Sequence, residues 1–243
     1  MRMHIRIRRV FEGDEVLSFA DLEFFGRAIF NGFSIDHNIC PRLCLEKDIA
    51  KLETEKETLT ENYLGKKFGF SAFGFFQNNT EVAEMMLKYV HEIFSGYDIK
   101  NTQLLDLYGG VGTFGIINAD LFENVVIVES YKPSVDMASI NVTNNKIDNV
   151  SAVCLNAKSM GRIKFNDKLF VITDPPRSGM EQKTIDTLKK LKPEVIIYVS
   201  CNAEQLGKDI KKFKEYTIRS AALFDMFPQT RHCETVVELI KIK

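Results

Sequence analysis

From residue 81 onward the chain alternates between helix-type and strand-type segments, and this alternation restricts its fold more than any other feature. Residues 81–94 repeat apolar side chains at helical spacing, and later helix-type segments separate short apolar runs. Such repetition predicts a doubly wound, mostly parallel, Rossmann-like α/β sheet with helices on both faces. The strand-type runs are 103–108, 125–130, 151–156, 169–174, 195–200, 216–224 and 234–242.

The expected sheet also predicts where a ligand binds. In open parallel sheets, ligands bind outside the carboxyl ends of the strands. We therefore expect the functional residues in the loops that follow the first five runs, after Leu107, Val128, Leu155, Thr173 and Val199.

The first part of the chain has a different character. Residues 2–8 alternate polar and apolar side chains, which predicts a half-exposed strand, and residues 16–20 predict a return strand. Arg2, Arg6 and Arg8 then form either a solvated strand face or a patch that contacts phosphate. Residues 43–64 are rich in charge, and we expect them to be helical or irregular. The prediction is a small N-terminal α+β portion, 1–70, and a larger domain, 71–243.

Composition narrows the classes of function. The 243 residues are 45% hydrophobic with a formal net charge of −1, so any contact with a polyanion depends on a local basic patch. We expect no membrane association and a cytoplasmic location, because there is no membrane-length apolar run and the N-terminus is too polar for a signal peptide. The five cysteines should be reduced, and the pair Cys40 and Cys44 lacks the second pair of a zinc site.

Three loops carry chemistry. Gly110, Gly112 and Gly115 form a G-x-G-x-x-G turn between a strand and a helix, and the next strand ends in Glu129. A glycine turn followed by an acid fits a dinucleotide or another adenosine cofactor equally well. Asp174 ends a strand and is followed by two prolines, which hold it more rigidly than a turn requires.

The third loop follows "VIIYVS" and begins with Cys201. A cysteine there is either a small buried apolar residue or a nucleophile delivered to the ligand edge. We expect Cys154 to be buried in its strand and residues 208–216 to form a solvated helix face. Among Phe73, Phe75 and Phe76, core packing is expected, with one ring free to stack on a base.

With these motifs in order, the chain resembles the RNA 5-methyluridine methyltransferases over about residues 61–238. The resemblance rests on "FGFFQNN", "LLDLYGGVGTFGI", "VVIVESYKPSVDMASINVTNNKIDNV", "ITDPPRSGM", "YVSCNAEQLGKDI" and "LFDMFPQTRHCETV". It implies a Rossmann-like methyltransferase domain that binds S-adenosylmethionine. The implied cofactor residues are Gln77, Tyr108, Gly110, Gly112, Thr113, Glu129, Asn156 and Asp174.

The resemblance also implies a chemistry. Cys201 would be the nucleophile, Glu234 the general base and Asp174 a further catalytic group, while Arg177, Asn202 and His232 would bind substrate. The family reaction forms 5-methyluridine in tRNA or rRNA through a covalent bond between the cysteine and C6 of uracil.

The sequence departs from the family pattern in places. Thr113 stands where asparagine is usual, and Ala203 replaces a proline after the nucleophile. The iron–sulfur cysteine cluster and the N-terminal RNA-binding barrel of many members are missing from this sequence. We therefore expect RNA as partner, S-adenosylmethionine as cofactor, no metal or iron–sulfur cluster, and no obligate protein partner. The alternatives are a nicotinamide-dependent oxidoreductase with the same glycine loop and a non-catalytic RNA-binding protein of the same fold.

Overall fold

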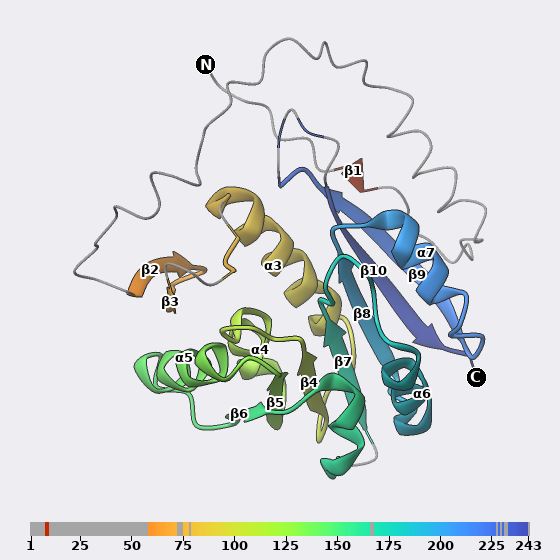
Figure 1. The fold of residues 1–243 in the computed structure, drawn as a ribbon, viewed down its shortest axis with the longest axis horizontal. Helices are drawn as coiled ribbons and strands as arrows, with labels where there is room; N and C mark the ends of the chain where they lie inside the picture. Colours follow the sequence, from red (N-terminus) through yellow and green to blue (C-terminus); the bar gives the residue numbers. More distant parts are fainter. Residues whose placement is uncertain are drawn as a thin grey trace.

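A computed structural model describes residues 8–9, 58–71, 75–77, 79–165, 168–226, 228, 230 and 233–242. Within these residues a large sheet carries helices on both faces, and a separate two-stranded hairpin lies beside it (Figure 1). No helix in this part of the chain is long and apolar enough to cross a bilayer.

The large sheet has the order β1-β9-β10-β8-β7-β4-β5-β6. β6, β5, β4, β7 and β8 run parallel, whereas β10 runs antiparallel to both β8 and β9. The strand order reverses at β4, which confirms the predicted doubly wound, mostly parallel Rossmann-like sheet. The strands are β4 (Gln103–Leu107), β5 (Asn124–Glu129), β6 (Val150–Cys154), β7 (Leu169–Thr173), β8 (Val195–Ser200), β9 (Tyr216–Phe224) and β10 (Glu234–Lys241).

Helices cover the two faces of the sheet and enclose two apolar cores. Every residue of β7 and β8 is buried, as the continuous apolar sequences "LFVIT" and "VIIYVS" require of central strands covered on both sides. One core contains α3 (Thr80–Ser95), α4 (Thr113–Ile117) and α5 (Lys132–Asn144). The other contains η3 (Ala157–Arg162), α6 (Gln182–Leu191) and α7 (Ala203–Ile210), and the short η2 (Ala119–Leu121) precedes β5.

The hairpin corrects one expectation. Its strands, β2 (Thr58–Tyr63) and β3 (Lys66–Ser71), meet at a tight turn in which Leu64 and Gly65 have φ of 49° and 78°. β2 lies in the charged segment 43–64, which was expected to be helical or irregular. That expectation was wrong for β2, because Glu61 is its one charged residue, its threonines and Tyr63 favour a strand, and cross-strand pairing with β3 and burial of Tyr63 stabilise it.

The hairpin is anchored to the large domain rather than standing apart from it. The side chain of Asn141 on α5 accepts from the Gly69 amide at 2.7 Å and donates to the Gly69 carbonyl at 3.0 Å. Tyr63 and Phe68 are part of the core that also contains α3 and α5, and Figure 1 shows the hairpin beside α5. The boundary between portions 1–70 and 71–243 stays a prediction.

At the N-terminal end, β1 (Arg8–Arg9) pairs antiparallel with β9, which agrees with a strand at the end of the alternating run. Arg2, Arg6 and the expected return strand at 16–20 lie outside the described residues. Cys154, expected to be buried in β6, is exposed because its strand lies at the edge of the sheet.

Candidate active site

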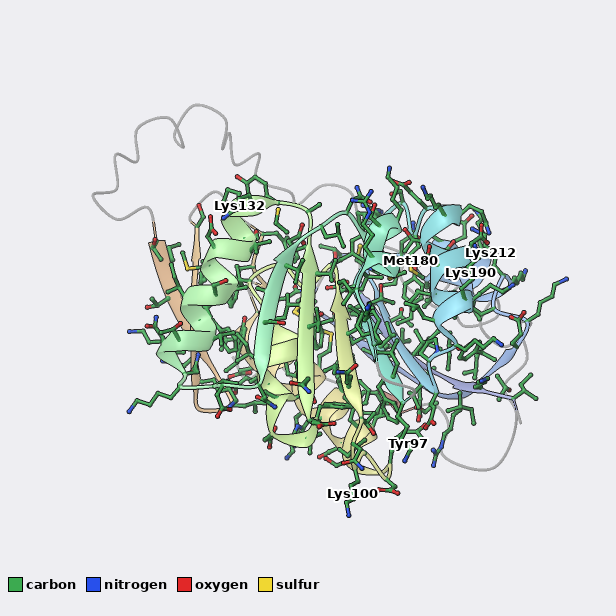
Figure 2. The ribbon with its side chains drawn as sticks, turned by 90° about the horizontal axis from the view of Figure 1, so that it is seen from below. Tyr97, Lys100, Lys132, Met180, Lys190 and Lys212 are labelled. Carbon is green, nitrogen blue, oxygen red and sulfur yellow. The ribbon has the colours of Figure 1, made fainter. Side chains whose placement is uncertain are left out.

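The carboxyl ends of the parallel strands meet at one edge of the sheet, as predicted. Figure 2 views the molecule with this edge uppermost, where Lys132 begins α5 after β5, while Lys100, which precedes β4, marks the opposite edge. β10 runs the other way, so its first residue, Glu234, enters the sheet at the same edge as the loops after β4, β5, β6, β7 and β8.

The buried side chain of Asp106 fixes the glycine turn that follows β4. The Asp106 carboxylate accepts a hydrogen bond from the Gly115 amide at 2.8 Å. Burial raises the pKa of Asp106 to about 7, although the Gly115 hydrogen bond acts in the opposite direction. Above it, Tyr108 and Gly112 have φ of 62° and 87°, and a Cβ built on Gly110 would meet nothing within 4 Å. The turn therefore presents open backbone over Gly110.

Glu129 joins the turn to the next loop. One carboxylate oxygen accepts from the Gly110 amide at 3.3 Å, and the other accepts from the amides of Ser130 at 2.6 Å and Tyr131 at 2.8 Å. The acid predicted to hold a ribose thus lies beside the open glycine backbone, and it also fixes the shape of both loops.

The remaining predicted cofactor residues lie at different depths. Gln77 is half-buried, its carbonyl accepts from the Tyr63 hydroxyl at 2.8 Å, and its side-chain oxygen is buried with no partner among the described residues. Thr113 begins α4, next to the glycine turn. Asn156 is exposed and caps η3 by accepting from the Lys158 amide at 3.1 Å. Of these residues, Gln77 is therefore the one whose buried, unpartnered side-chain oxygen most strongly indicates a bound ligand.

Cys201 and Glu234 are brought together by the β8–β10 ladder. Its final pair is Ser200 with Thr235, so Cys201 and Glu234 are the next residue on each strand. Cys201 is half-buried, whereas Glu234 is 3% exposed and one of its carboxylate oxygens has no partner within the described part of the chain. An unpaired buried carboxylate beside a thiol is costly for folding alone and is expected where a reaction uses it.

The ionisable groups around Cys201 shift the pKa values of one another. Burial raises the pKa of Glu234 from its ordinary 4.5 to about 7. The pKa of Asp174 lies well above its ordinary value because of burial and because of the neighbouring Glu234 and Asp106. Burial, Glu234 and Asp174 together raise the pKa of the Cys201 thiol, and the Arg177 guanidinium opposes them. The three groups thus share one poorly solvated site.

The loop that follows Asp174 is tied to its neighbours. The Asp174 amide donates to the Leu107 carbonyl at 3.3 Å, which joins the loop to the glycine turn. Further along, the Met180 amide donates to the buried carboxylate of Asp209 on α7 at 2.9 Å. Arg177 lies between them with an exposed side chain, and its carbonyl accepts from the Asn202 side chain at 3.2 Å.

Asp209 corrects the expectation of a solvated helix face at 208–216. Its side chain is fully buried and also accepts from the Tyr198 hydroxyl at 2.8 Å, the Gln205 amide group at 3.1 Å and the Lys212 ammonium at 3.0 Å. Figure 2 shows Met180 and Lys212, two of the residues that contact this carboxylate, on the same side of the molecule. Sequence reasoning missed Asp209 because an acid among lysines is typical of an exposed helix.

Other residues that support the site were missed as well. Tyr63 comes from the hairpin, and Asp106 stands inside an apolar strand, where its polar side chain was the available signal. His232 was predicted to bind substrate, but it lies outside the described residues, as does Phe73. In the residues that the structure describes, no cluster of three or more metal-ligating side chains occurs.

The described residues fit S-adenosylmethionine. The Glu129 carboxylate lies beside open backbone at Gly110, where a Cβ would meet nothing within 4 Å, and the unpartnered side-chain oxygen of Gln77 is a further acceptor available to a ligand. The acidic groups of Asp174 and Glu234 are also suited to a cationic sulfonium, which would favour their ionised forms.

Comparison with known proteins agrees with this geometry. A family model described as tRNA (Uracil-5-)-methyltransferase matches residues 32–242. A tRNA (uracil(54)-C(5))-methyltransferase from Pyrococcus horikoshii is 41% identical over 199 residues, which are 80% of this chain and 46% of the relative. An uncharacterized RNA methyltransferase from Caldanaerobacter subterraneus is 39% identical over 184 residues, 74% of this chain and 40% of the relative. The chain thus spans less than half the length of these relatives.

Solved structures show the same fold. The crystal structure of Pyrococcus abyssi tRNA (uracil-54, C5)-methyltransferase in complex with S-adenosyl-L-homocysteine aligns with a TM-score of 0.67 and 34% identity, covering 76% of this chain and 45% of that chain. A SAM-dependent methyltransferase from Agrobacterium tumefaciens aligns with a TM-score of 0.55 at 15% identity, covering 79% of this chain and 72% of the other, and supports the fold alone.

Proposed function

Because the chain belongs to the tRNA (uracil-5-)-methyltransferase family, we propose that it transfers a methyl group from S-adenosylmethionine to C5 of a uridine in tRNA or rRNA. The observation that carries the proposal is the juxtaposition of Cys201 and Glu234 beside Asp174 in one buried, charged site. A nicotinamide-dependent oxidoreductase needs the glycine turn but has no use for this thiol and its carboxylate neighbour.

The residues divide the reaction between them. Cys201 adds as a thiolate to C6 of uracil, and the electron pair of the C5–C6 double bond moves into an enolate that makes C5 nucleophilic. S-Adenosylmethionine, when bound, supplies an electrophilic methyl group to that carbon. Glu234 then takes the C5 proton, the electrons of the C5–H bond restore the double bond, and the Cys201 thiolate leaves.

Asp174 and Arg177 are proposed to handle the uracil ring and its charge. Since the pKa of Asp174 is raised, this carboxyl group can keep a proton and donate a hydrogen bond to the O4 oxygen as negative charge develops there. Arg177, exposed on the same loop, is placed to contact a phosphate or the developing enolate.

Phe75 supports an RNA substrate. It is 75% exposed next to Gln77, whereas its neighbour Phe76 is 9% exposed and stacks on Phe70 and Tyr63 with ring centroids 4.0 and 5.2 Å apart. A target uridine must leave its stack to reach the half-buried Cys201 thiol, and an exposed aromatic ring can stack on a base of the rearranged RNA. We include the portion 1–70 in this RNA contact.

The decisive test is the product. Purified protein, labelled S-adenosylmethionine and unmodified tRNA or rRNA should yield labelled 5-methyluridine when the RNA is digested and its nucleosides are analysed by mass spectrometry. Calorimetry should show binding of S-adenosylmethionine and none of NAD. Binding of the cofactor without methylation of any RNA from a strain lacking the protein would favour a non-catalytic RNA-binding role instead.

A further inference from the structure

Asn202 follows the nucleophile, and both ends of its side-chain amide are engaged by the protein. The oxygen accepts from the Gln205 amide at 3.2 Å and caps α7, while the nitrogen donates to the Arg177 carbonyl at 3.2 Å. Its own backbone amide donates to the Ser200 hydroxyl at 3.1 Å. Cys201 therefore lies in a turn whose two flanking residues are fixed.

The hydrogen bond to Arg177 crosses from one loop of the site to another. Arg177 lies on the loop that begins with Asp174, and Asp209 holds the far end of this loop through Met180. The Asp209 contact is deep in the α6–α7 layer, whereas the Asn202 contact lies at the carboxyl edge beside Cys201. The bond from Asn202 thus joins the nucleophile turn directly to the Asp174 loop.

We propose that Asn202 is a positioning residue that sets the Cys201 sulfur relative to the Asp174 loop, rather than a residue that binds uracil itself. The inference rests on the proposed function, in which Asp174 holds the ring that Cys201 attacks. The sulfur must approach C6 along a narrow range of directions, so the two loops need one fixed separation. A displacement of about 1 Å between reacting groups can lower a rate by roughly 100-fold.

Three substitutions separate the capping role from the link between loops. Asn202→Ser and Asn202→Asp keep an oxygen that can cap α7, but neither carries the nitrogen that donates to Arg177. Asn202→Ala removes both functions. The serine variant adds no charge near Cys201, so agreement between the serine and aspartate variants excludes an effect of charge on the thiol.

The first measurement uses RNA that carries 5-fluorouridine at the methylated position. Cys201 can add to C6 and C5 can be methylated, but fluorine cannot leave as a proton does, so the protein–RNA adduct accumulates and is counted on a denaturing gel. At saturating RNA and S-adenosylmethionine, we expect adduct formation to be about 10- to 100-fold slower in the serine and aspartate variants. Their melting temperatures and affinities for S-adenosylmethionine should match the wild type.

The second measurement separates positioning from direct contact. Hydrogen exchange of residues 174–180 in the free protein should be faster in the serine and aspartate variants, because the link exists without RNA. Unchanged exchange would overturn the inference in favour of direct uracil binding, and so would wild-type rates of adduct formation. If the wild type itself forms no adduct while its cofactor binds, the proposed function fails, and the role of Asn202 in aligning the attack fails with it.

Discussion

Cys201 and Glu234 are adjacent across antiparallel strands, each one residue beyond the final pair of the β8–β10 ladder. Val199 and Val236, two residues further into each strand, are both in the core under α3, so the alternation of side chains directs Cys201 and Glu234 to that same face. The influence of Glu234 on the pKa of the thiol is consistent with this proximity.

Substitutions of Cys201 and Glu234 should block different steps of the proposed reaction. Cys201→Ala should give neither adduct nor product, because the ring is never activated. In the Glu234→Gln protein, Cys201 should still add to uracil and C5 should still be methylated. Loss of the base should slow release of the RNA from Cys201 by roughly 10²–10⁴-fold. An RNA-linked protein that carries labelled methyl should then persist on a denaturing gel. Full turnover by Glu234→Gln would assign the base to another group, such as His232.

Glu234 should also make stability depend on pH. Because its pKa rises from 4.5 to about 7 on folding, the folded state holds a proton that the unfolded state has lost in this interval. The free energy of unfolding should therefore fall as pH rises from about 4.5 to about 7, by at most roughly 3.5 kcal/mol at about 1.4 kcal/mol per pKa unit.

Chemical denaturation of Glu234→Gln and wild type across this range measures the contribution of Glu234 together with its effect on the pKa of Asp174 and of Cys201, since Asp106 is common to both. The variant should equal wild type near pH 4 and exceed it at pH 8. The exposed Glu123 gives the control: Glu123→Gln should show no such divergence from wild type. Parallel curves for Glu234→Gln and wild type would contradict the raised pKa.

Glu129→Ala should weaken S-adenosylmethionine binding by about 1.5–3 kcal/mol, as expected for hydrogen bonds to a charged group. Glu129 also fixes the loop through Gly110 and Tyr131, so the loss has two sources. Calorimetry with a cofactor analogue that lacks the ribose 2′-hydroxyl separates the two sources. The wild type should bind this analogue more weakly than the natural cofactor, whereas Glu129→Ala should bind the analogue and the natural cofactor with equal affinity. Equal penalties in both proteins would exclude a ribose contact.

Gly179 and Gly207 form a matched pair for the loop anchored by Asp209. A Cβ on Gly179, whose φ is +79°, would lie 2.3 Å from an Asp209 carboxylate oxygen, whereas a Cβ on Gly207 would meet nothing within 4 Å. Gly179→Ala should lower the free energy of unfolding by about 2–4 kcal/mol. Gly207→Ala, inside α7, should raise it by roughly 0.5–1 kcal/mol. Urea unfolding of both variants measures the contrast.

Phe75 and Phe76 should separate RNA binding from folding. Phe75→Ala should weaken RNA binding by about 1–3 kcal/mol for one lost stacked base, with unchanged stability. Phe76→Ala should instead lower stability by roughly 3–5 kcal/mol, because its ring is packed in the core. Filter binding and thermal melting of each variant test the pair, and normal RNA affinity in Phe75→Ala would leave its ring without this role.

The central fold could be predicted because β7 and β8 are uninterrupted apolar runs, and burial on both faces imposes that composition. β2 could not, since Tyr63 is the single buried residue of this strand and pairing with β3 is what makes it a strand. Motifs predicted Cys201 and Glu234, and the structure places them next to each other across β8 and β10, while their chemical roles stay predictions. Asp209 and the second role of Asn202 could not be predicted, because their partners come from other loops that only the folded chain brings near.

The antiparallel course of β10 has a consequence for the order in which the site is completed. β10 lies between β8 and β9, although both of those strands precede it in the chain and are synthesised first. β9 therefore has no partner beside β8 until β10 inserts, and until then Cys201 at the end of β8 lacks its neighbour Glu234 on β10. Under the proposed mechanism, a partly made chain would lack the base that completes a turnover, so the docking of β10 would be the folding step that brings the two proposed catalytic groups together.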